Sequence, residues 1–397
     1  MSVSTLLNIE ACPRRWSLSL SEYPEIWERS GYPPKPYIAT LAGQVIHSSL
    51  ELITNSLDQA GCASTQDPLF VTVLRKLGGF SHIVKTKIEQ VVSSLSVNPR
   101  AQNIVGQIAS RLRAKLPELR TRLQMIIGKL PIQNSGGINK KSKRVSNARI
   151  PLTAGMHAEV ELRAADLRWH GFVDLINIGS EACEIIDFKT GEADQDHEFQ
   201  ARVYNLLWSR DTDLNPTGRS VDRLVLSYFD SEVEISPQDE LALTQFESEL
   251  ISRTQASLKL IQEEPPLARP SLQNCRFCPV RQICNDYWIE STQRKIAAER
   301  REESSIGPEN TFADFEVKLH ERQTLTRWRG EVVAGDQISP GTAVHIQFTE
   351  NNMSLLTALK IGNCLRLIEA NLINQSADQT SQEWFIILHS MSEAYFL

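Results

Sequence analysis

The chain has 397 residues, of which 41% are hydrophobic and 23% charged, which is the composition of an ordinary globular protein. Because no run of eighteen apolar residues occurs and the first residues lack the features of a signal peptide, we expect a cytoplasmic protein without membrane association. Seven cysteines are an odd number, and the cytoplasm keeps thiols reduced, so metal binding explains clustered cysteines better than disulfides do.

The net charge of −6 is unevenly distributed. Residues 100–149 contain twelve lysines and arginines and one acid, a net charge of +11, so the rest of the chain carries −17. This asymmetry is typical of a polyanion-binding segment on an acidic body, although a solvated helix face with a basic loop gives the same pattern. The candidate nucleic-acid-binding residues are Arg111, Arg113, Arg120, Lys140, Lys141, Lys143 and Arg144.

Apolar residues at spacings of three and four predict helices in the N-terminal part, at about 41–57, 83–95 and 104–123. Pro117 is expected to kink the third helix. After Arg149, alternating or apolar runs predict strands at 158–167, 169–178, 184–188 and 223–229, with helices at about 197–208 and 237–263. This mixture indicates an α/β core.

Three parts of the chain follow from these patterns. Residues 1–291 form the α/β domain, with a helical insertion at about 60–150. Residues 292–310 are charged and poor in apolar residues, which predicts a linker. Short strand-like runs in 311–397 predict a small all-β domain, for which a five-stranded OB-like barrel is one fitting architecture. Acids outnumber bases there, so its charge favours an interaction module over nucleic-acid binding.

The clearest chemical motif is Gly171-Phe-Val-Asp174 followed by Asp187-Phe-Lys189-Thr-Gly191. Residues two apart on a strand face the same side, so Asp187 and Lys189 project together. Two carboxylates provide the oxygen ligands that Mg²⁺ and Mn²⁺ prefer, and a neighbouring lysine offsets charge that develops on a phosphate. Taken alone, the Asp-x-Lys triplet is more often a surface ion pair, because such triplets are common by chance.

Two helical pairs flank this motif. Gly43 and His47 share one helix face, and an imidazole completes a Mn²⁺ site beside carboxylates, although such a histidine is more often partly buried core. Gln200 and Tyr204 are likewise four residues apart on the helix expected after Asp187. An ordinary amphipathic helix explains that pair by itself.

The order G-x-x-x-H, G-x-x-D, D-x-K-T-G and Q-x-x-x-Y resembles the RecB-like branch of the PD-(D/E)XK nuclease superfamily over about residues 2–287. The resemblance implies a restriction-endonuclease-like mixed sheet flanked by helices. It also implies that His47, Asp174 and Asp187 bind Mg²⁺ or Mn²⁺. Lys189 would be the catalytic lysine, with Gln200 and Tyr204 orienting it or the DNA. Glu159 and Glu161 remain alternative assisting carboxylates.

The spacing Cys275-x₂-Cys278-x₅-Cys284 supplies three thiolates, whereas a tetrahedral site needs four. Among the remaining cysteines, Cys12 is the best candidate because the arrangement resembles the iron–sulfur branch of the same superfamily, which includes AddB-type subunits and CRISPR-associated RecB-like exonucleases. That branch implies a [4Fe–4S] cluster formed by one N-terminal and three C-terminal cysteines. Zinc is the alternative occupant.

We therefore expect a metal-dependent deoxyribonuclease. Relatives with the histidine motif imply an exonuclease acting on single-stranded DNA or DNA ends. Gly128-Lys129 is followed by Leu130, so no G-x-x-x-x-G-K-[ST] phosphate-binding loop occurs, and unwinding requires a separate helicase or complex subunit. The alternative is a non-catalytic DNA-binding or scaffold subunit of a helicase–nuclease or defence complex.

Overall fold

The structure is a computed structural model that describes residues 1–62, 64–130, 149–179, 182–189, 191, 194–228, 230–304, 312–335, 337–349, 352–378 and 381–397. These residues form two compact units. The first unit contains Met1–Leu7, Pro36–Leu95 and Ile108–Ala256; the second contains Asn8–Lys35, Ser96–Gln107 and Ser257–Leu397. This division differs from the boundaries at 291 and 311, because residues 8–35 belong to the same unit as the C-terminal part.

The first unit contains a five-stranded mixed sheet in the order β1-β2-β3-β4-β5. The strands are β1 (Gly155–Ala164), β2 (Trp169–Ile178), β3 (Cys183–Phe188), β4 (Arg223–Ser227) and β5 (Glu232–Ile235). Only the β3–β4 pair is parallel, and α8 (Gln195–Arg210) connects these two strands. The predicted mixed α/β fold is confirmed.

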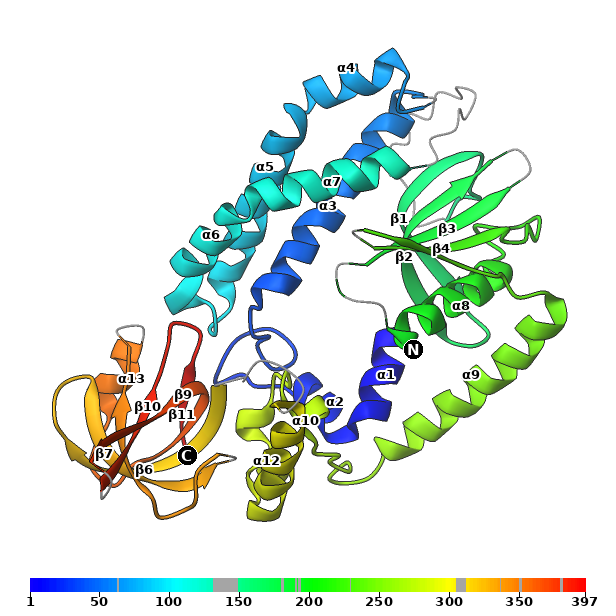
Figure 1. Ribbon diagram of the computed structural model, residues 1–397. Helices are drawn as coiled ribbons and strands as arrows, with labels where there is room; N and C mark the ends of the chain where they lie inside the picture. Colours follow the sequence, from blue (N-terminus) through cyan, green and yellow to red (C-terminus); the bar gives the residue numbers. More distant parts are fainter. Residues whose placement is uncertain are drawn as a thin grey trace. The chain divides into compact units, whose positions relative to one another are not determined.

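Helix α8 packs against β1 to β4 and provides much of the core on one face of the sheet (Figure 1). Its residues Val203, Leu206, Leu207 and Trp208 are each at most 1% exposed, among apolar side chains of the sheet. Burying one large apolar side chain stabilises a fold by roughly 1.5–3 kcal/mol, so this contact fixes α8 against the sheet. Met1, Val3 and Leu6, the last two from α1 (Val3–Ala11), join the same core.

A helical group covers another part of the first unit, and α3 packs against β1, α5 and α7 (Figure 1). The helices of this group are α3 (Ile38–Gln59), α4 (Pro68–Lys76), α5 (Gly79–Ser94), α6 (Val105–Ala114) and α7 (Leu116–Lys129). Helix α9 (Glu240–Leu260) instead adds Leu250 to the core formed by α8 and the sheet. The predicted apolar face of α3 is buried from Leu41 to Leu57. The segment predicted as one kinked helix is instead two helices that meet at Lys115. Pro117 lies in the first turn of α7, where a backbone N–H has no partner within the helix, so the N–H that proline lacks is not needed there.

In the second unit, α2 (Pro13–Leu20), α10 (Leu272–Cys275), α11 (Asn285–Trp288) and α12 (Glu290–Ser304) surround the predicted metal-binding cysteines. Short 3₁₀ turns lie at Leu95–Val97, Gln102–Ile104 and Arg281–Ile283. Residues 292–304, which the sequence predicts as linker, are the helix α12. The reason is Ile296, which is 1% exposed against Leu272, Tyr287 and Trp288. Residues 305–310 lie outside the described residues.

The C-terminal residues form a small β-barrel domain, as predicted. Its strands are β6 (Phe312–Arg322), β7 (Arg327–Gly335), β8 (Ala343–Gln347), β9 (Cys364–Asp378), β10 (Ser381–Ile387) and β11 (Glu393–Phe396), with α13 (Met353–Ala358) between β8 and β9. Strand β10 pairs with both β8 and β9, which closes β8-β7-β6-β9-β10 into a ring of five strands. A five-stranded barrel of this kind is the architecture of the OB fold.

No helix in the described parts of the chain combines the length and the apolar character that crossing a membrane requires.

Candidate metal centre

Asp174 and Asp187 lie beside each other because of the register of two strands. Strand β2 pairs antiparallel with β3, with Leu175 opposite Ile186, so the two aspartates follow at the same end of the pair. The Phe188 backbone N–H donates to Asp174 Oδ2 at 2.6 Å, which fixes that carboxylate against β3. Asp187 is 4% exposed. The predicted Asp174 and Asp187 pair therefore lies in one partly buried site.

His47 comes to the same site from α3, which packs on β1. Its Nδ1 lies 3.1 Å from Asp174 Oδ1. One ligand atom each of His47, Glu159 and Asp174 lies within 4.8 Å of the other two, close enough for a single ion to bind all three. One imidazole and two carboxylates suit Mn²⁺ or Mg²⁺, both of which accept oxygen ligands.

The structure distinguishes Glu159 from Glu161, which the sequence left as alternatives. Strand β1 pairs Ala158 with Leu175 and Val160 with Val173, and Glu159 lies between them with a φ of 51°, unusual for a residue with a side chain. Position 159 is thus level with Asp174 on β2, and a Glu159 carboxylate oxygen lies close to ligand atoms of His47 and Asp174. Glu161 instead accepts a hydrogen bond from Arg163 at 2.6 Å.

Burial and mutual repulsion change the acidity of this group. Burial and the charge of Asp174 raise the pKa of Glu159 to about 7. Burial and Asp174 likewise raise the pKa of Asp187 to about 6, against the opposing charge of Lys189. Burial disfavours protonated His47, but its hydrogen bond to Asp174 and the surrounding carboxylates raise its pKa overall. A divalent cation would neutralise this concentrated negative charge, so the residues present fit such an ion.

A chain of polar contacts extends from Asp187 to Tyr204. Lys189 Nζ contacts Asp187 Oδ2, an oxygen that accepts no hydrogen bond of normal geometry, and donates to Gln200 Oε1 at 2.6 Å. Gln200 Nε2 in turn donates to the Tyr204 hydroxyl at 2.5 Å. Gln200 and Tyr204, predicted from their spacing, thus reach Lys189 and hold its ammonium group beside Asp187.

Gly171 of the G-x-x-D motif makes room for this chain. A Cβ atom at Gly171 would lie 2.8 Å from Tyr204 Cε1 and 3.2 Å from Leu207 Cδ1, closer than normal contact. A side chain on β2 at this position would therefore displace Tyr204 from Gln200. The motif contains glycine because α8 packs directly on the strand.

The basic segment is only partly available for binding DNA. Arg100 is buried, and Arg149 forms an ion pair with Asp211 at 2.6 Å, so these two have structural partners. Arg111 and Arg120 are exposed, and Arg113 pairs with Glu89 on the surface. Lys140, Lys141, Lys143 and Arg144 lie outside the described residues. Arg122, absent from the predicted binding residues, donates to the Lys189 backbone carbonyl at 3.0 Å, a contact that no spacing rule identifies.

The four candidate cluster cysteines all belong to the second unit. Burial, and to a smaller extent the nearby thiols of Cys278, Cys284 and Cys12, raise the pKa of the Cys275 thiol to about 12. The Arg269 backbone N–H points at Cys12 Sγ at 3.4 Å, the type of contact that stabilises a thiolate. The fold thus brings together Cys12 and the three cysteines from more than 260 residues later.

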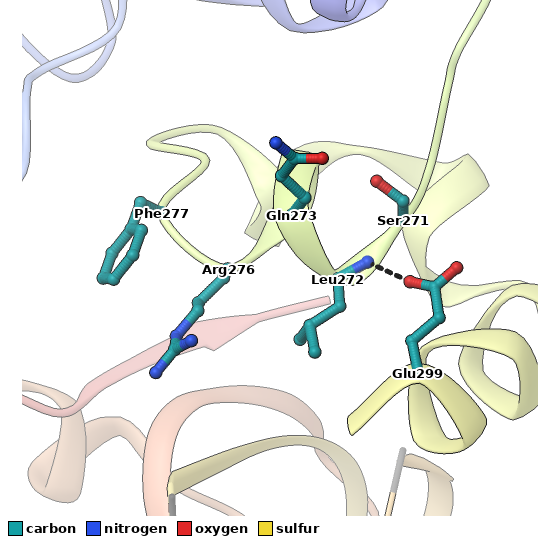
Figure 2. A pocket seen from close by; sticks show the side chains of 6 residues that line it. All are labelled: Ser271, Leu272, Gln273, Arg276, Phe277 and Glu299. Atoms are coloured by element: carbon teal, nitrogen blue, oxygen red, sulfur yellow. Dashed lines mark hydrogen bonds between the residues drawn. The ribbon is translucent and has the colours of Figure 1, made fainter. Parts of the chain in front are cut away.

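A shallow cavity of about 530 Å³ lies beside the cysteine loop (Figure 2). Its lining residues are Ser271, Leu272, Gln273, Arg276, Phe277 and Glu299. Glu299 from α12 accepts a hydrogen bond from the Leu272 backbone N–H at 2.5 Å, which ties α12 to the start of α10. This contact, with buried Ile296, fixes α12 to the loop.

Comparison with known proteins places these features in a family. The model of the PD-(D/E)XK nuclease superfamily matches residues 1–285. No curated protein matches the chain. Among solved structures, "Crystal structure of SSO0001" is similar at 21% identity over 32% of this chain and 59% of that one, with a TM-score of 0.21.

Proposed function

Because the chain belongs to the PD-(D/E)XK nuclease superfamily, we propose that it is a deoxyribonuclease that uses Mg²⁺ or Mn²⁺ to hydrolyse phosphodiester bonds. The observation that carries this proposal is the set of three ligand atoms, from His47, Glu159 and Asp174, within 4.8 Å of one another. Asp187 and Lys189 lie beside them. A scaffold protein has no need to retain both a ligand set and a lysine held next to it.

His47, Glu159 and Asp174 would hold the ion, with Asp187 as a further carboxylate. A bound divalent cation supplies Lewis-acid polarisation of a phosphoryl oxygen and lowers the pKa of water. Lys189 is oriented by Gln200, so its ammonium group has a fixed position beside the carboxylates. A preorganised cation of this kind stabilises negative charge that develops on the phosphate during attack. Tyr204 fixes Gln200 in turn.

The substrate is DNA that is single-stranded or has free ends, and the mode of cleavage is exonucleolytic. The resemblance of the four ordered motifs to RecB-like exonucleases supports this finer assignment. We also propose that a separate helicase or complex subunit supplies unwinding. The exposed arginines Arg111 and Arg120, together with the lysines of residues 140–143, would contact phosphates.

The second proposed group is a [4Fe–4S] cluster bound by Cys12, Cys275, Cys278 and Cys284. The arrangement of one N-terminal and three C-terminal cysteines resembles the iron–sulfur branch of the superfamily, which favours a cluster over a single zinc ion. The cluster would connect residues 12 and 275, at the two ends of the family-matched region.

The deciding experiment compares three proteins on labelled single-stranded and double-stranded DNA with free ends, with and without Mn²⁺. The unmodified chain is expected to shorten single strands from an end only when Mn²⁺ is present. Lys189→Ala should retain Mn²⁺ affinity but lose cleavage roughly 10²–10³-fold, the effect of removing one preorganised donor. Asp187→Asn should weaken Mn²⁺ binding because it removes a carboxylate charge.

The surface pair of Arg202 and Glu198 on α8 gives a matched control. Arg202→Gln removes a cation from the helix that carries Gln200 and Tyr204, and Arg202 pairs with Glu198 and not with Lys189. Its cleavage rate should equal that of the unmodified chain. A chain without metal-dependent cleavage would support the scaffold alternative. Cleavage by Lys189→Ala at the unmodified rate would remove Lys189 from the mechanism.

A further inference from the structure

Side chains of β7 alternate between the interior and the outer face of the C-terminal barrel. Trp328, Gly330 and Val332 are buried toward the barrel interior, whereas Arg327, Arg329 and Glu331 alternate with them and face outward. Successive residues of a strand point to opposite faces, so these three belong to one surface. The barrel as a whole is acidic, but its charges are not evenly mixed on this surface.

One row of outward residues crosses four neighbouring strands. Arg329 on β7 is opposite His345 on β8, His345 is paired with Phe385 on β10, and Phe385 is opposite Ile373 on β9. The rings of His345 and Phe385 are stacked, with centroids 4.9 Å apart and planes at 18°. At the two ends, the Arg329 side chain is 54% exposed and Ile373 is 38% exposed. We call Arg329, His345, Phe385 and Ile373 the stacking strip.

The charges around the stacking strip are arranged on its two sides. Arg327 lies in the next row, where its Nε donates to Gln347 Oε1 at 3.2 Å. The acids Glu331 and Glu383 lie on the opposite side of the strip. Glu321 approaches Arg329 at 3.8 Å, but both side chains are more than half exposed. A pair this exposed is worth little, so Arg329 is not committed to Glu321.

We propose that the stacking strip binds single-stranded DNA. Nucleobases present flat π-faces that stack on aromatic side chains, and the adjacent arginines fit the phosphates. Duplex DNA hides its base faces, so a strip of rings and an apolar side chain on a convex sheet suits a single strand. This inference rests on the proposed function, because the nuclease supplies the reason for a DNA strand to reach the protein. It gives the C-terminal barrel a role in substrate binding.

The test measures binding without cleavage. The full chain, in EDTA, is titrated against a fluorescein-labelled oligo(dT) of twenty nucleotides, and anisotropy is followed at several salt concentrations. Phe385→Ala should weaken binding about 5- to 150-fold, the range found when one stacking aromatic is truncated to alanine. Phe385→Tyr keeps an aromatic face and should retain the affinity. Phe396→Ala removes an exposed phenylalanine of β11, outside the strip, and should have no effect.

Arg329→Gln provides a second measurement that does not depend on packing, since the side chain is exposed. Losing one phosphate contact should reduce the slope of log affinity against log salt by about 0.7. If circular dichroism shows that Phe385→Ala unfolds the barrel, this slope decides the question. No oligo(dT) binding by the unmodified chain, or unchanged affinity and slope in both variants, overturns the inference.

Failure of the proposed nuclease function has a different signature. Cleavage without a role of the strip leaves the nuclease proposal standing and rejects the strip. Binding through the strip without metal-dependent cleavage rejects the nuclease proposal and leaves the strip as a DNA-binding surface.

Discussion

The ion pair of Arg100 with Glu393 predicts how the second unit responds to acid. Arg100 donates from Nε to Glu393 Oε1 at 2.7 Å and from its terminal nitrogen to Oε2 at 2.6 Å, and Lys35 lies 3.4 Å from Oε2. Burial alone would raise the pKa of Glu393, but the hydrogen bonds and charge of Arg100 lower it from 4.5 to about 2.

A carboxyl group with a lowered pKa stabilises the fold above its unfolded-state pKa, and this contribution disappears as pH falls through the folded value. For Glu393 the stabilisation is present above about pH 4.5 and is lost toward about pH 2. At about 1.4 kcal/mol per pKa unit, the difference corresponds to roughly 3 kcal/mol. Glu393→Gln should therefore destabilise the unit at pH 7 by at least this amount, because Arg100 stays buried without its carboxylate.

The assay is urea unfolding followed by tryptophan fluorescence, since five of the seven tryptophans belong to the second unit. The unmodified chain and Glu393→Gln should differ by roughly 3 kcal/mol or more at pH 7 and converge toward pH 2. Glu383→Gln, an exposed carboxylate of the same barrel, should differ from the unmodified chain by less than about 0.5 kcal/mol. A gap for Glu393→Gln that is the same at pH 3 and pH 7 would refute this account.

Four further predictions concern the proposed sites. Glu159→Gln should weaken Mn²⁺ binding, measured by calorimetry, about 10- to 100-fold. Glu161→Gln, two residues away and paired with Arg163, should leave the affinity unchanged, and equal effects of the two substitutions would contradict the choice of Glu159. Gly171→Ala should slow cleavage and cost about 1–3 kcal/mol in thermal unfolding because its Cβ meets Tyr204, while Gly128→Ala, which has nothing within 4 Å, should stabilise α7 slightly. Cys275→Ala should abolish the brown colour and iron content of anaerobically purified protein, and a colourless parent protein with one equivalent of zinc would reject the cluster. Neutralising Lys140, Lys141, Lys143 and Arg144 should reduce the salt dependence of DNA affinity by about 0.7–0.9 per lost phosphate contact, whereas an unchanged slope assigns that segment to solubility.

The motifs of the candidate site have local spacing, so the sequence predicts which of their side chains share a face. Asp187 lies on β3 and Lys189 directly after its end, two residues on, while Gln200 and Tyr204 are four apart on one helix, so period alone predicts a shared face for each pair. The contact between Lys189 and Gln200 depends on how α8 packs on the sheet. That packing is visible in the sequence only through Gly171, whose missing Cβ makes room for Tyr204.

Partners in a different segment were not predictable. Composition assigns Arg100 to a basic segment, but its side chain is buried beside Glu393, almost 300 residues later. Similarly, residues 292–304 are so charged that composition predicts a linker, yet the buried side chain of Ile296 fixes α12 against Tyr287 and Trp288. Composition averages over a segment, whereas one buried side chain determines whether the segment packs. The net charge of +11 therefore overestimates the positive charge that residues 100–149 can present to DNA.

The choice between Glu159 and Glu161 shows the limit most clearly. Strict alternation along β1 places both glutamates on the same face, so no periodic rule separates them. The pairing of β1 with β2 separates them: position 159 lies between the pairs Ala158–Leu175 and Val160–Val173, level with Asp174, whereas Glu161 is opposite Phe172. This register exists only once the two strands are paired, so the sequence of β1 alone does not reveal it. Glu159 also has a left-handed backbone with a φ of 51°, which costs about 1–3 kcal/mol at a residue with a side chain. Strand register therefore determines which of the two carboxylates meets His47 and Asp174.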